Sequence, residues 1–299
     1  MSRILVLGAA AMDTVARARS FPKTDDIVSA ESVLHIPGGS AANVAVGLSR
    51  LGADVSFLGT VGADADGDAI AAAFDDERVK TAHLLRIPDG RTAGTFIAVD
   101  SSGERIMFSL GGDAVYTRVS QLDGIDFSVD ALYIAEAFSE VGAAAAARVL
   151  EKGGRVFFAP GGVMCGYGLD KLGPLVQICG TMIVSLPELK SLTGRSDVRA
   201  GADALFSAGA RELVITQGAH GAGFYTKRGF MFAPAVSANV VDTTGAGDAF
   251  AAAYLFSELR GDPPRARLMF ANRCAAFAVS HVGARTSPRP DEIDMEEPS

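Results

Sequence analysis

The sequence contains no tryptophan, and among its 299 residues it has only three cysteines and four histidines. The cysteines are far apart and odd in number, which argues against a disulfide framework and favours a reducing, cytoplasmic location. The histidines do not show the spacing of zinc ligands. The sequence therefore predicts neither a disulfide-stabilised scaffold nor a zinc domain.

Long apolar runs and an excess of basic residues are also missing. The apolar runs are much shorter than the ~20 residues that a bilayer-spanning helix needs, and we interpret the run at residues 4–12 as a buried strand because Asp13 ends it. The 27 lysines and arginines are outnumbered by 35 aspartates and glutamates, so the formal net charge is −8. Proteins that bind nucleic acids usually carry a positive surplus. We expect no nucleic-acid partner and no membrane partner.

Short apolar segments alternate with longer helical patterns along the whole chain. We predict buried strands at residues 3–8, 54–59, 131–135, 155–159, 181–185 and 212–216. We predict helices at residues 40–51, 67–76, 140–151, 168–178, 187–193 and 247–259. Fully apolar strands separated by helices are typical of a mostly parallel sheet with helices on both faces. The predicted fold is therefore a doubly wound α/β fold, an αβα sandwich.

Two strand-like stretches interrupt this alternation. Residues 92–110 resemble a hairpin around a Ser-Ser-Gly turn, and residues 26–36 are a further candidate strand. The two stretches could pair into a small sheet above the carboxyl ends of the main strands, where ligands bind in this architecture; a surface hairpin without function is equally consistent. Because no linker divides the chain, we expect one domain over residues 1–299, with lid insertions at about 14–36 and 91–112.

Two glycine-rich segments lie beside predicted elements. Residues 38–43 (GGSAAN) open the first predicted helix, and residues 216–223 (TQGAHGAG) follow the last predicted strand. Paired glycines let a backbone approach a ligand closely, and Asn43 could direct an amide at a hydroxyl group. The second segment could accommodate a flat ring or a phosphate, although it lacks the order of a P-loop or a dinucleotide motif. Each segment is also consistent with an ordinary turn.

A third glycine-rich segment, residues 242–250 (DTTGAGDAF), is more specific because it leads into an apolar helix. Gly245, Ala246 and Gly247 have little or no side chain, so their N–H groups can converge at a helix N-terminus that attracts anions. Asp248 either stabilises the helix start or acts as a base beside the anion site. A carboxylate beside an anion site is electrostatically unfavourable unless the substrate needs both groups. This cost favours the second role, that of a base. With an alcohol as acceptor, this arrangement fits phosphoryl transfer.

In these segments the chain resembles the ribokinase (PfkB) family of carbohydrate and nucleoside kinases, and the resemblance extends over nearly the whole chain. Residues 38–67 resemble the family's N-terminal signature, and residues 242–250 resemble its C-terminal signature. The resemblance implies a ribokinase-like fold with a small β-sheet lid and an ATP-dependent phosphotransferase that acts on an alcohol group. It also implies Mg²⁺ and, as in many members of the family, a monovalent cation such as K⁺.

The resemblance further implies roles for individual residues. The catalytic set is Asp248 as the base, with Gly245, Ala246 and Gly247 as the anion hole. The acceptor-binding set is Asp13, Gly38, Gly39 and Asn43, and the nucleotide-binding set is Thr216, Gly218, Gly221 and Asn272. Glu188 matches a position that orders Mg²⁺ through water. Asp242 and Thr244, with main chain around Ala278 and Gly283, match the monovalent-cation region.

The sequence departs from the family's pattern at two positions. Where the family often has Asn-x-x-Glu, this chain has Ser185 three residues before Glu188. Because a hydroxyl can still hold a water, we expect altered rather than absent metal handling. Ala159 stands where some relatives have an aspartate, and the sequence offers no reason for that change.

Three functions are compatible with this pattern. The first is an ATP-dependent kinase that phosphorylates a primary hydroxyl of a sugar or a sugar-like molecule. The second is a nucleoside kinase that acts on a ribose 5′-hydroxyl, for which Phe96, Ile106 and Phe108 could form apolar walls around the base or, alternatively, the packing face of the lid. The third is a non-catalytic sensor of the same fold. An exposed lid edge also makes a homodimer through the lid strands an expectation.

Overall fold

The computed structural model describes residues 1–112 and 117–295, and its largest element within them is a nine-stranded sheet. The strands of this sheet are β1 (Arg3–Gly8), β4 (Asp54–Gly62), β5 (Lys80–Ile87), β8 (Ala131–Ala135), β9 (Arg155–Ala159), β10 (Thr181–Ser185), β11 (Glu212–Thr216), β12 (Gly221–Thr226) and β13 (Gly229–Pro234). Their order is β13-β12-β11-β10-β9-β8-β1-β4-β5. From β11 to β5 all neighbours are parallel, and β12 and β13 add an antiparallel edge.

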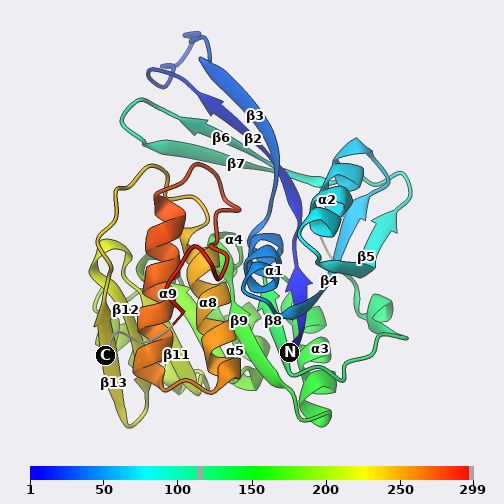
Figure 1. Ribbon diagram of the computed structural model, residues 1–299, viewed down its shortest axis with the longest axis vertical. Helices are drawn as coiled ribbons and strands as arrows, with labels where there is room; N and C mark the ends of the chain where they lie inside the picture. The colour runs from blue at the N-terminus through cyan, green and yellow to red at the C-terminus, as the bar shows by residue number, and fades with distance from the viewer. Residues whose placement is uncertain (113–116, 296–299) are drawn as a thin grey trace.

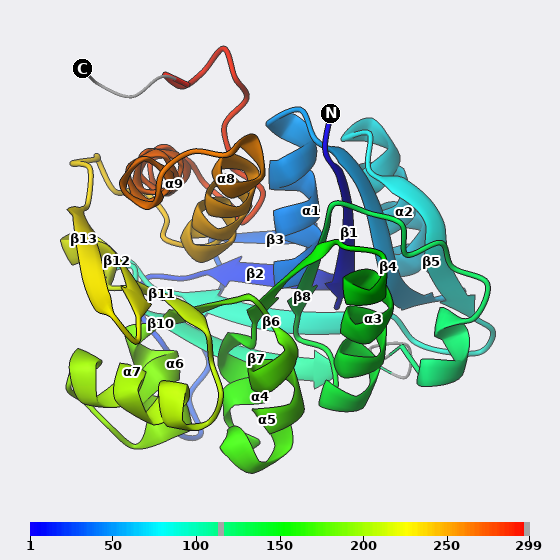
Figure 2. The same cartoon turned by 90° about the horizontal axis from the view of Figure 1, so that it is seen from below.

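Helices cover both faces of this sheet (Figures 1 and 2). One face carries α1 (Ser40–Arg50), α2 (Ala65–Asp76), α8 (Ala246–Arg260) and α9 (Pro264–Val279). The other carries α3 (Ser139–Glu151), α4 (Gly161–Cys165), α5 (Gly168–Ile178), α6 (Leu186–Thr193) and α7 (Val198–Ser207). Alternate residues of β1 enter opposite cores, Ile4 with the first group and Leu5 with the second, as the two-residue period of a strand requires. The predicted doubly wound αβα fold is confirmed.

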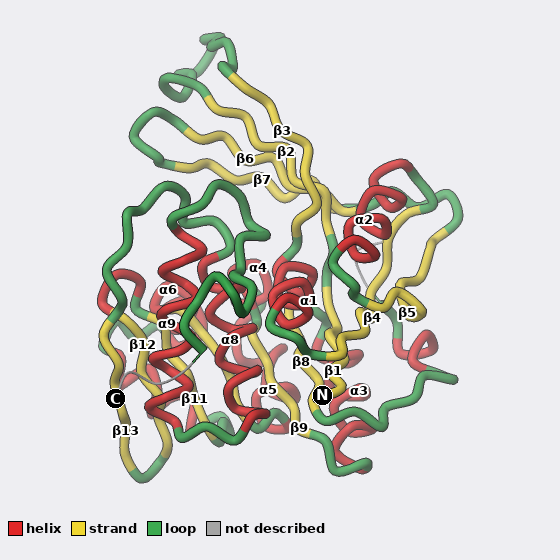
Figure 3. Tube along the Cα trace, viewed as in Figure 1, coloured by secondary structure: helices red, strands yellow, loops and turns green. Residues whose placement is uncertain are grey.

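A second sheet of four strands projects beyond this body (Figures 1 and 3). It consists of β2 (Ala11–Arg17), β3 (Ser32–Gly38), β6 (Ala93–Val99) and β7 (Arg105–Gly111), in the order β3-β2-β6-β7. We call it the lid sheet. The apolar run at residues 4–12 is therefore shared by two strands, because β1 ends at Gly8 and β2 begins at Ala11.

Several boundaries differ from the sequence-based expectation. The strand predicted at 26–36 begins only at Ser32, and the predicted turn at 216–223 contains the short 3₁₀ helix η2 (Gly218–His220) and the start of β12. The elements not predicted from the sequence are β5, β12, β13, α4, α7 and α9, and a second 3₁₀ helix, η1 (Val119–Leu122). β13 lies at the sheet edge with most side chains exposed, although its sequence GFMFAP is almost entirely apolar. None of the helices in the described ranges is both long and apolar enough to cross a bilayer.

Candidate active site

A narrow cleft separates the lid sheet from the loops beside α8 and α9. Its lining residues are Asp13, Val15, Arg17, Leu34, Ile36, Ile97, Val99, Asp242, Thr244, Val282, Gly283 and Ala284. The cleft thus brings together the first strand of the lid sheet and the segment that precedes α8. Ligands of doubly wound folds bind beyond the carboxyl ends of the parallel strands, where this cleft lies.

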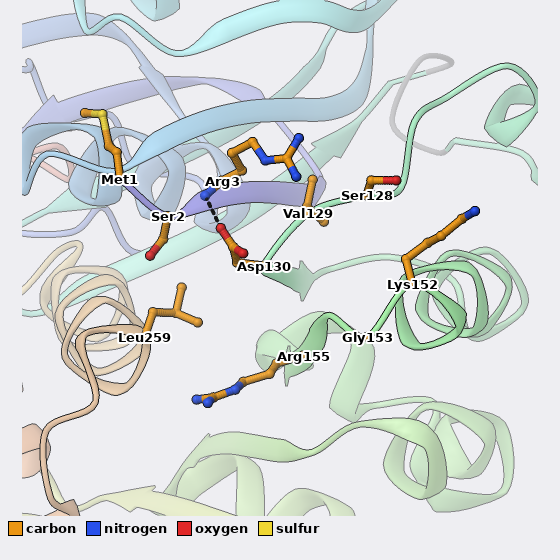
Figure 4. A pocket seen from close by; sticks show the side chains of 10 residues that line it. All are labelled: Met1, Ser2, Arg3, Ser128, Val129, Asp130, Lys152, Gly153, Arg155 and Leu259. Atoms are coloured by element: carbon orange, nitrogen blue, oxygen red, sulfur yellow. Dashed lines mark hydrogen bonds between the residues drawn. The ribbon is translucent and has the colours of Figure 1, made fainter.

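A roomier cavity of about 430 Å³ lies elsewhere, at the amino ends of β1, β8 and β9 (Figure 4). There the backbone N–H of Arg3 donates to Asp130 at 2.7 Å, while the side chains of Lys152 and Arg155 point in different directions. The cationic groups therefore do not converge on one ligand position. The predicted site residues lie instead toward the carboxyl ends of the parallel strands.

Asp248 lies in the first turn of α8, directly after the predicted anion hole. Its carboxylate accepts two hydrogen bonds from α1: Oδ1 from the Ser40 hydroxyl at 2.7 Å and Oδ2 from the Asn43 amide at 2.8 Å. Gly245 caps the helix in the left-handed region, with φ at 78°, and a Cβ there would lie 2.1 Å from the Ala284 carbonyl oxygen. Only glycine fits this position without a shift of the backbone.

The predicted anion hole would consist of N–H groups at the start of α8, where the first four lack acceptors within the helix. The Ala246 N–H makes a long contact of 3.4 Å with the Thr243 carbonyl oxygen. A Cβ on Gly247 would meet no atom within 4 Å, so the space in front of this residue is open. The helix N-terminus therefore borders open space at Gly247, directly before Asp248.

Burial raises the pKa of Asp248 to about 6. The hydrogen bonds from Asn43 and Ser40 oppose this shift, whereas the charges of Glu188 and Asp13 add to it. The carboxylate is therefore mostly ionised at neutral pH, yet it is a better proton acceptor than an exposed aspartate. This combination suits a general base.

Asp13 lies on β2, where the lid sheet leaves the body, and its exposed fraction is 8%. Burial raises its pKa to about 6, while a hydrogen bond from Thr95 and the charge of Arg285 favour the ionised form. A Cβ on Gly38 would lie 2.0 Å from Asp13 Oδ2, and Gly39 has a φ of 91°. Gly38 thus lets the carboxylate approach the backbone just before α1, whereas a Cβ on Gly39 would lie 2.7 Å from the Ala9 carbonyl oxygen.

Glu136 is a site residue that the sequence analysis missed. It follows β8 directly, and its φ of 52° is unusual for a residue other than glycine. Its carboxylate accepts a hydrogen bond from the Ser40 backbone N–H, and its pKa is raised to about 7 by burial and by the charges of Asp248, Asp13 and Glu188. A polar residue immediately after a buried strand was the available signal.

Arg285 is a second residue that was not predicted, and it places a positive charge near Asp13. Its Nε donates to Asn43 Oδ1 at 3.3 Å, and its guanidinium lies 5.4 Å from the centre of the Phe74 ring. Burial lowers its pKa to about 10, against the opposing charges of Glu77 and Asp13, so it stays protonated at neutral pH. Arg285 therefore orients the amide that holds Asp248.

Glu188 and Ser185 form a capping box at the start of α6. The Ser185 N–H donates to Glu188 Oε2 at 2.7 Å, and the Glu188 N–H donates to the Ser185 hydroxyl at 3.4 Å. The Glu188 charge still reaches Asp248 and Glu136, because it contributes to the raised pKa of both. Mg²⁺ prefers oxygen ligands and keeps several waters, so a carboxylate beside these groups fits a water-mediated Mg²⁺ site. The structure does not explain Ala159.

Asp242 and Thr244 organise the loop before the anion hole. Asp242 Oδ1 accepts from the Thr244 N–H at 2.9 Å and from the Thr244 hydroxyl at 2.7 Å, and Oδ2 accepts from the Gly283 N–H at 3.1 Å. Burial opposes ionisation, but these hydrogen bonds hold the Asp242 pKa below its usual value. The carbonyl oxygens of Ala278 and Gly283 both accept from the Thr286 hydroxyl nearby. An ionised carboxylate beside carbonyl oxygens is a donor set that suits a monovalent cation.

The predicted nucleotide residues separate into two groups. Thr216 ends β11, and Gly218 follows with φ at 57°; a Cβ on Gly218 would meet no atom within 4 Å, so this turn borders open space. Gly221 and Asn272 instead hold the β12–β13 hairpin. A Cβ on Gly221 would lie 2.2 Å from the Ala233 carbonyl oxygen, and the Asn272 amide donates to Ala233 and Pro234 carbonyl oxygens at 3.1 and 2.9 Å.

The register of the lid sheet determines which side chains face the cleft. Asp13 pairs with Thr95, and Val15 pairs with Ile97, so these residues share the inner face that lines the cleft. Phe96, Ile106 and Phe108 occupy the alternate positions and therefore lie on the outer face. The interpretation of these three residues as walls around a nucleobase is wrong, because a one-residue offset in a strand reverses the face. Aliphatic residues of the inner face line the cleft instead.

Comparisons with known proteins agree with this geometry. A family model described as "pfkB family carbohydrate kinase" matches residues 1–292. An ATP-dependent ribose-1-phosphate kinase from Halopiger xanaduensis is 31% identical over 98% of this chain and 97% of its own. An aminoimidazole riboside kinase from Salmonella typhimurium is 30% identical over 98% of this chain and 94% of its own. The structure of Arabidopsis thaliana ribokinase with ribose and ATP has a TM-score of 0.86, 22% identity and 97% coverage of both chains.

Proposed function

Because the chain belongs to the pfkB family of carbohydrate kinases, we propose that it transfers the γ-phosphoryl group of ATP to a hydroxymethyl group of a sugar or a sugar-like acceptor. The observation that carries this proposal is the placement of Asp248. Its carboxylate stands beside the backbone N–H groups at the start of α8, and Ser40 and Asn43 fix both of its oxygens. A base and an anion site are thereby held side by side, with open space in front of Gly247.

In the proposed mechanism, the acceptor lies between the lid sheet and the body. Asp13 and Asn43 bind its hydroxyl groups, and the backbone of Gly38 and Gly39 lets it approach closely. Asp248 accepts the proton of the attacking hydroxyl as the bond to phosphorus forms. The N–H groups of Gly245, Ala246 and Gly247 stabilise the equatorial oxygens of the transferring group, where charge gathers in a loose transition state.

The phosphoryl donor and the cations have assigned positions in this proposal. Thr216 and Gly218 border the nucleotide, while Gly221 and Asn272 shape that border by holding the β12–β13 hairpin. Glu188 would hold Mg²⁺ through water, and Asp242 and Thr244 would contribute to a monovalent-cation site. When bound, Mg²⁺ neutralises phosphate charge. The remaining steps depend on the residues of the chain itself.

A nucleoside is the second candidate acceptor. The inner face of the lid sheet contributes Val15, Leu34, Ile36 and Ile97 to the cleft, and this aliphatic surface would suit a nucleobase better than a free polyol. Its ribose would present a 5′-hydroxyl to the same Asp248. A non-catalytic sensor is disfavoured, because such a protein has no need of a carboxylate fixed at this position.

The proposal also concerns the organisation of the whole chain. We infer one domain over residues 1–299 with lid insertions at about 14–36 and 91–112, and a homodimer formed through the lid sheet.

The cysteines Cys165, Cys179 and Cys274 are buried free thiols. Together with the use of ATP, this agrees with a reducing compartment such as the cytoplasm.

The test is an assay of ADP release with ATP and MgCl₂ against D-ribose, D-fructose, ribose 1-phosphate and inosine. We expect turnover of at least one acceptor, and the preferred one separates the sugar hypothesis from the nucleoside hypothesis. Asp248→Asn should lower kcat by at least about a hundredfold while ATP binding, measured by calorimetry, is retained. Asp170→Asn, which changes an aspartate in the first turn of α5, should match the wild type. Absence of turnover with every acceptor, or an active Asp248→Asn variant, would refute the assignment.

A further inference from the structure

Two arginines lie in one row across the inner face of the lid sheet, at the end farther from Asp13. Arg17 of β2 pairs with Val99 of β6, and Val99 pairs with Arg105 of β7. Residues paired in this way point to the same face of a sheet. Both side chains therefore face the body, on the same side as the aliphatic residues that line the cleft.

Both arginines contact the loop that leads into the anion hole. The Arg105 guanidinium donates to the Thr244 hydroxyl and to the Thr243 hydroxyl, each at 2.8 Å. Arg17 Nη2 lies 3.7 Å from Asp242 Oδ2. Thr243 and Thr244 directly precede Gly245, the residue that caps α8. The lid sheet therefore places a positive charge on the two residues just before the N–H groups at the start of α8.

The acceptors of Arg105 are weak partners for a guanidinium. Both are neutral hydroxyl groups, and the Thr244 hydroxyl already donates to Asp242 Oδ1 at 2.7 Å. Hydrogen bonds from a guanidinium to a phosphate oxygen are roughly twice as strong as neutral ones and are often bidentate. A phosphate at the anion hole would thus be the stronger acceptor.

We propose that Arg105 is a phosphoryl-binding residue that the lid sheet delivers to the anion hole. This inference rests on the proposed function. With ATP in place, the guanidinium exchanges the two threonine hydroxyls for a non-bridging oxygen of the γ-phosphoryl group, and no covalent step is added. Arg17 stays on Asp242 and keeps the same end of the lid seated on the loop.

This arrangement couples the two substrates. Asp13 and Thr95 pair across the lid sheet, and Val99, which neighbours Arg105, is in the same strand as Thr95. An acceptor bound at Asp13 therefore stabilises the contact between the body and the lid sheet, which carries Arg105. The acceptor should tighten the binding of ATP, and ATP should be hydrolysed slowly in its absence.

The experiment compares Arg105→Ala with Arg19→Ala, using the best acceptor of the substrate panel. Arg19 is an exposed lid arginine paired with Glu31, so its variant controls for loss of a lid charge. We expect Arg105→Ala to lower kcat at least about tenfold, and added guanidinium to restore part of the rate. Calorimetry with β,γ-imido-ATP should show that the acceptor tightens nucleotide binding in the wild type and in Arg19→Ala, but not in Arg105→Ala. Wild-type kinetics and coupling in Arg105→Ala would overturn the inference.

Thr243→Val distinguishes phosphate binding by Arg105 from a purely structural role in which Arg105 only ties the lid sheet to the loop before α8. It removes one hydroxyl that Arg105 contacts, so near-wild-type kcat supports a role toward phosphate, and a loss equal to that of Arg105→Ala refutes it. A phosphate on the acceptor is the other oxyanion that Arg105 could bind. A defect confined to ribose 1-phosphate, with D-ribose and inosine unaffected, would also refute the inference. If the wild type has no kinase activity, the proposed function fails first, and the two failures are distinguishable.

Discussion

At the scale of single residues, the site concentrates carboxylates in a small volume. The charges of Asp13 and Glu188 act on both Glu136 and Asp248, and burial raises the pKa of Asp13 and Asp248 to about 6 and that of Glu136 to about 7. The folded state therefore binds protons more tightly than the unfolded chain. Consequently, the contribution of these three groups to the free energy of unfolding falls as pH rises from about 4 to about 7, and their full penalty remains above that range.

Glu136→Gln should relieve part of this penalty. The amide has no charge to bury and still offers an oxygen to the Ser40 N–H. We expect the variant to exceed the wild type in unfolding free energy by on the order of 1–3 kcal/mol at pH 8, with the gain lost near pH 4. Urea unfolding at both pH values measures it. Glu140→Gln, at an exposed position of α3, is the control, and an equal gain at pH 4 and pH 8 would contradict the explanation.

At the scale of elements, α8 depends on glycines at both ends. Gly245 precedes the helix with φ at 78°, and Gly261 follows it with φ at 90°. The two differ in their surroundings. A Cβ on Gly245 would lie 2.1 Å from the Ala284 carbonyl oxygen, whereas a Cβ on Gly261 would meet no atom within 4 Å. The N-terminal end of α8 is therefore fixed against the Ala284 backbone, and the C-terminal end is not.

This difference predicts the effects of Gly245→Ala and Gly261→Ala. Both variants force alanine into the left-handed region, which costs about 1–2 kcal/mol. Gly245→Ala must also displace the Ala284 backbone, so we expect a larger loss of stability and a fall in kcat of about a hundredfold, because the anion hole moves. Thermal unfolding and steady-state assays check both effects. Equal activity of the two variants would show that the position of the helix start is unimportant.

At the scale of the whole molecule, the lid sheet has two contrasting faces. The inner face lines the cleft along β2, β3 and β6, whereas the outer face carries Phe96, Ile106 and Phe108, and Phe108 is 57% exposed. Both edge strands, β3 and β7, also have one side without a neighbouring strand among the described residues. A second copy of the chain would cover this apolar surface, which is the basis of the proposed homodimer.

Phe108→Asp should weaken such a dimer. A charge at the centre of an apolar interface is left without a partner, so we expect a shift from dimer to monomer by at least about tenfold in the dissociation constant. Sedimentation or light scattering over a range of concentrations measures the shift. Val163→Asp, at a side chain of α4 that is 56% exposed, controls for a new surface charge. A wild-type chain that is monomeric at all concentrations would contradict the proposal.

Sequence alone determined the features that are contiguous in the chain. The alternation of apolar strands and helices predicted the doubly wound fold, and the segment 242–250 predicted a helix start with an acidic residue beside exposed N–H groups. Both follow from local propensity and spacing, which need no knowledge of distant residues. The outer strand β5 escaped prediction because its sequence KTAHLLRI lacks a continuous apolar run, whereas β13 was missed although its sequence GFMFAP is apolar.

Tertiary structure alone decided which distant residues share the site. Ser40 reaches Asp248 across 208 positions of sequence, and Arg105 reaches Thr244 across 139. Arg285 carries no recognisable motif, the position of Glu136 after β8 does not by itself show that it reaches the Ser40 N–H, and the register of the lid sheet turned Phe96 and Phe108 away from the cleft. The physical reason is that these relationships depend on how the sheets and helices pack, and packing is a property of the folded chain rather than of any one segment.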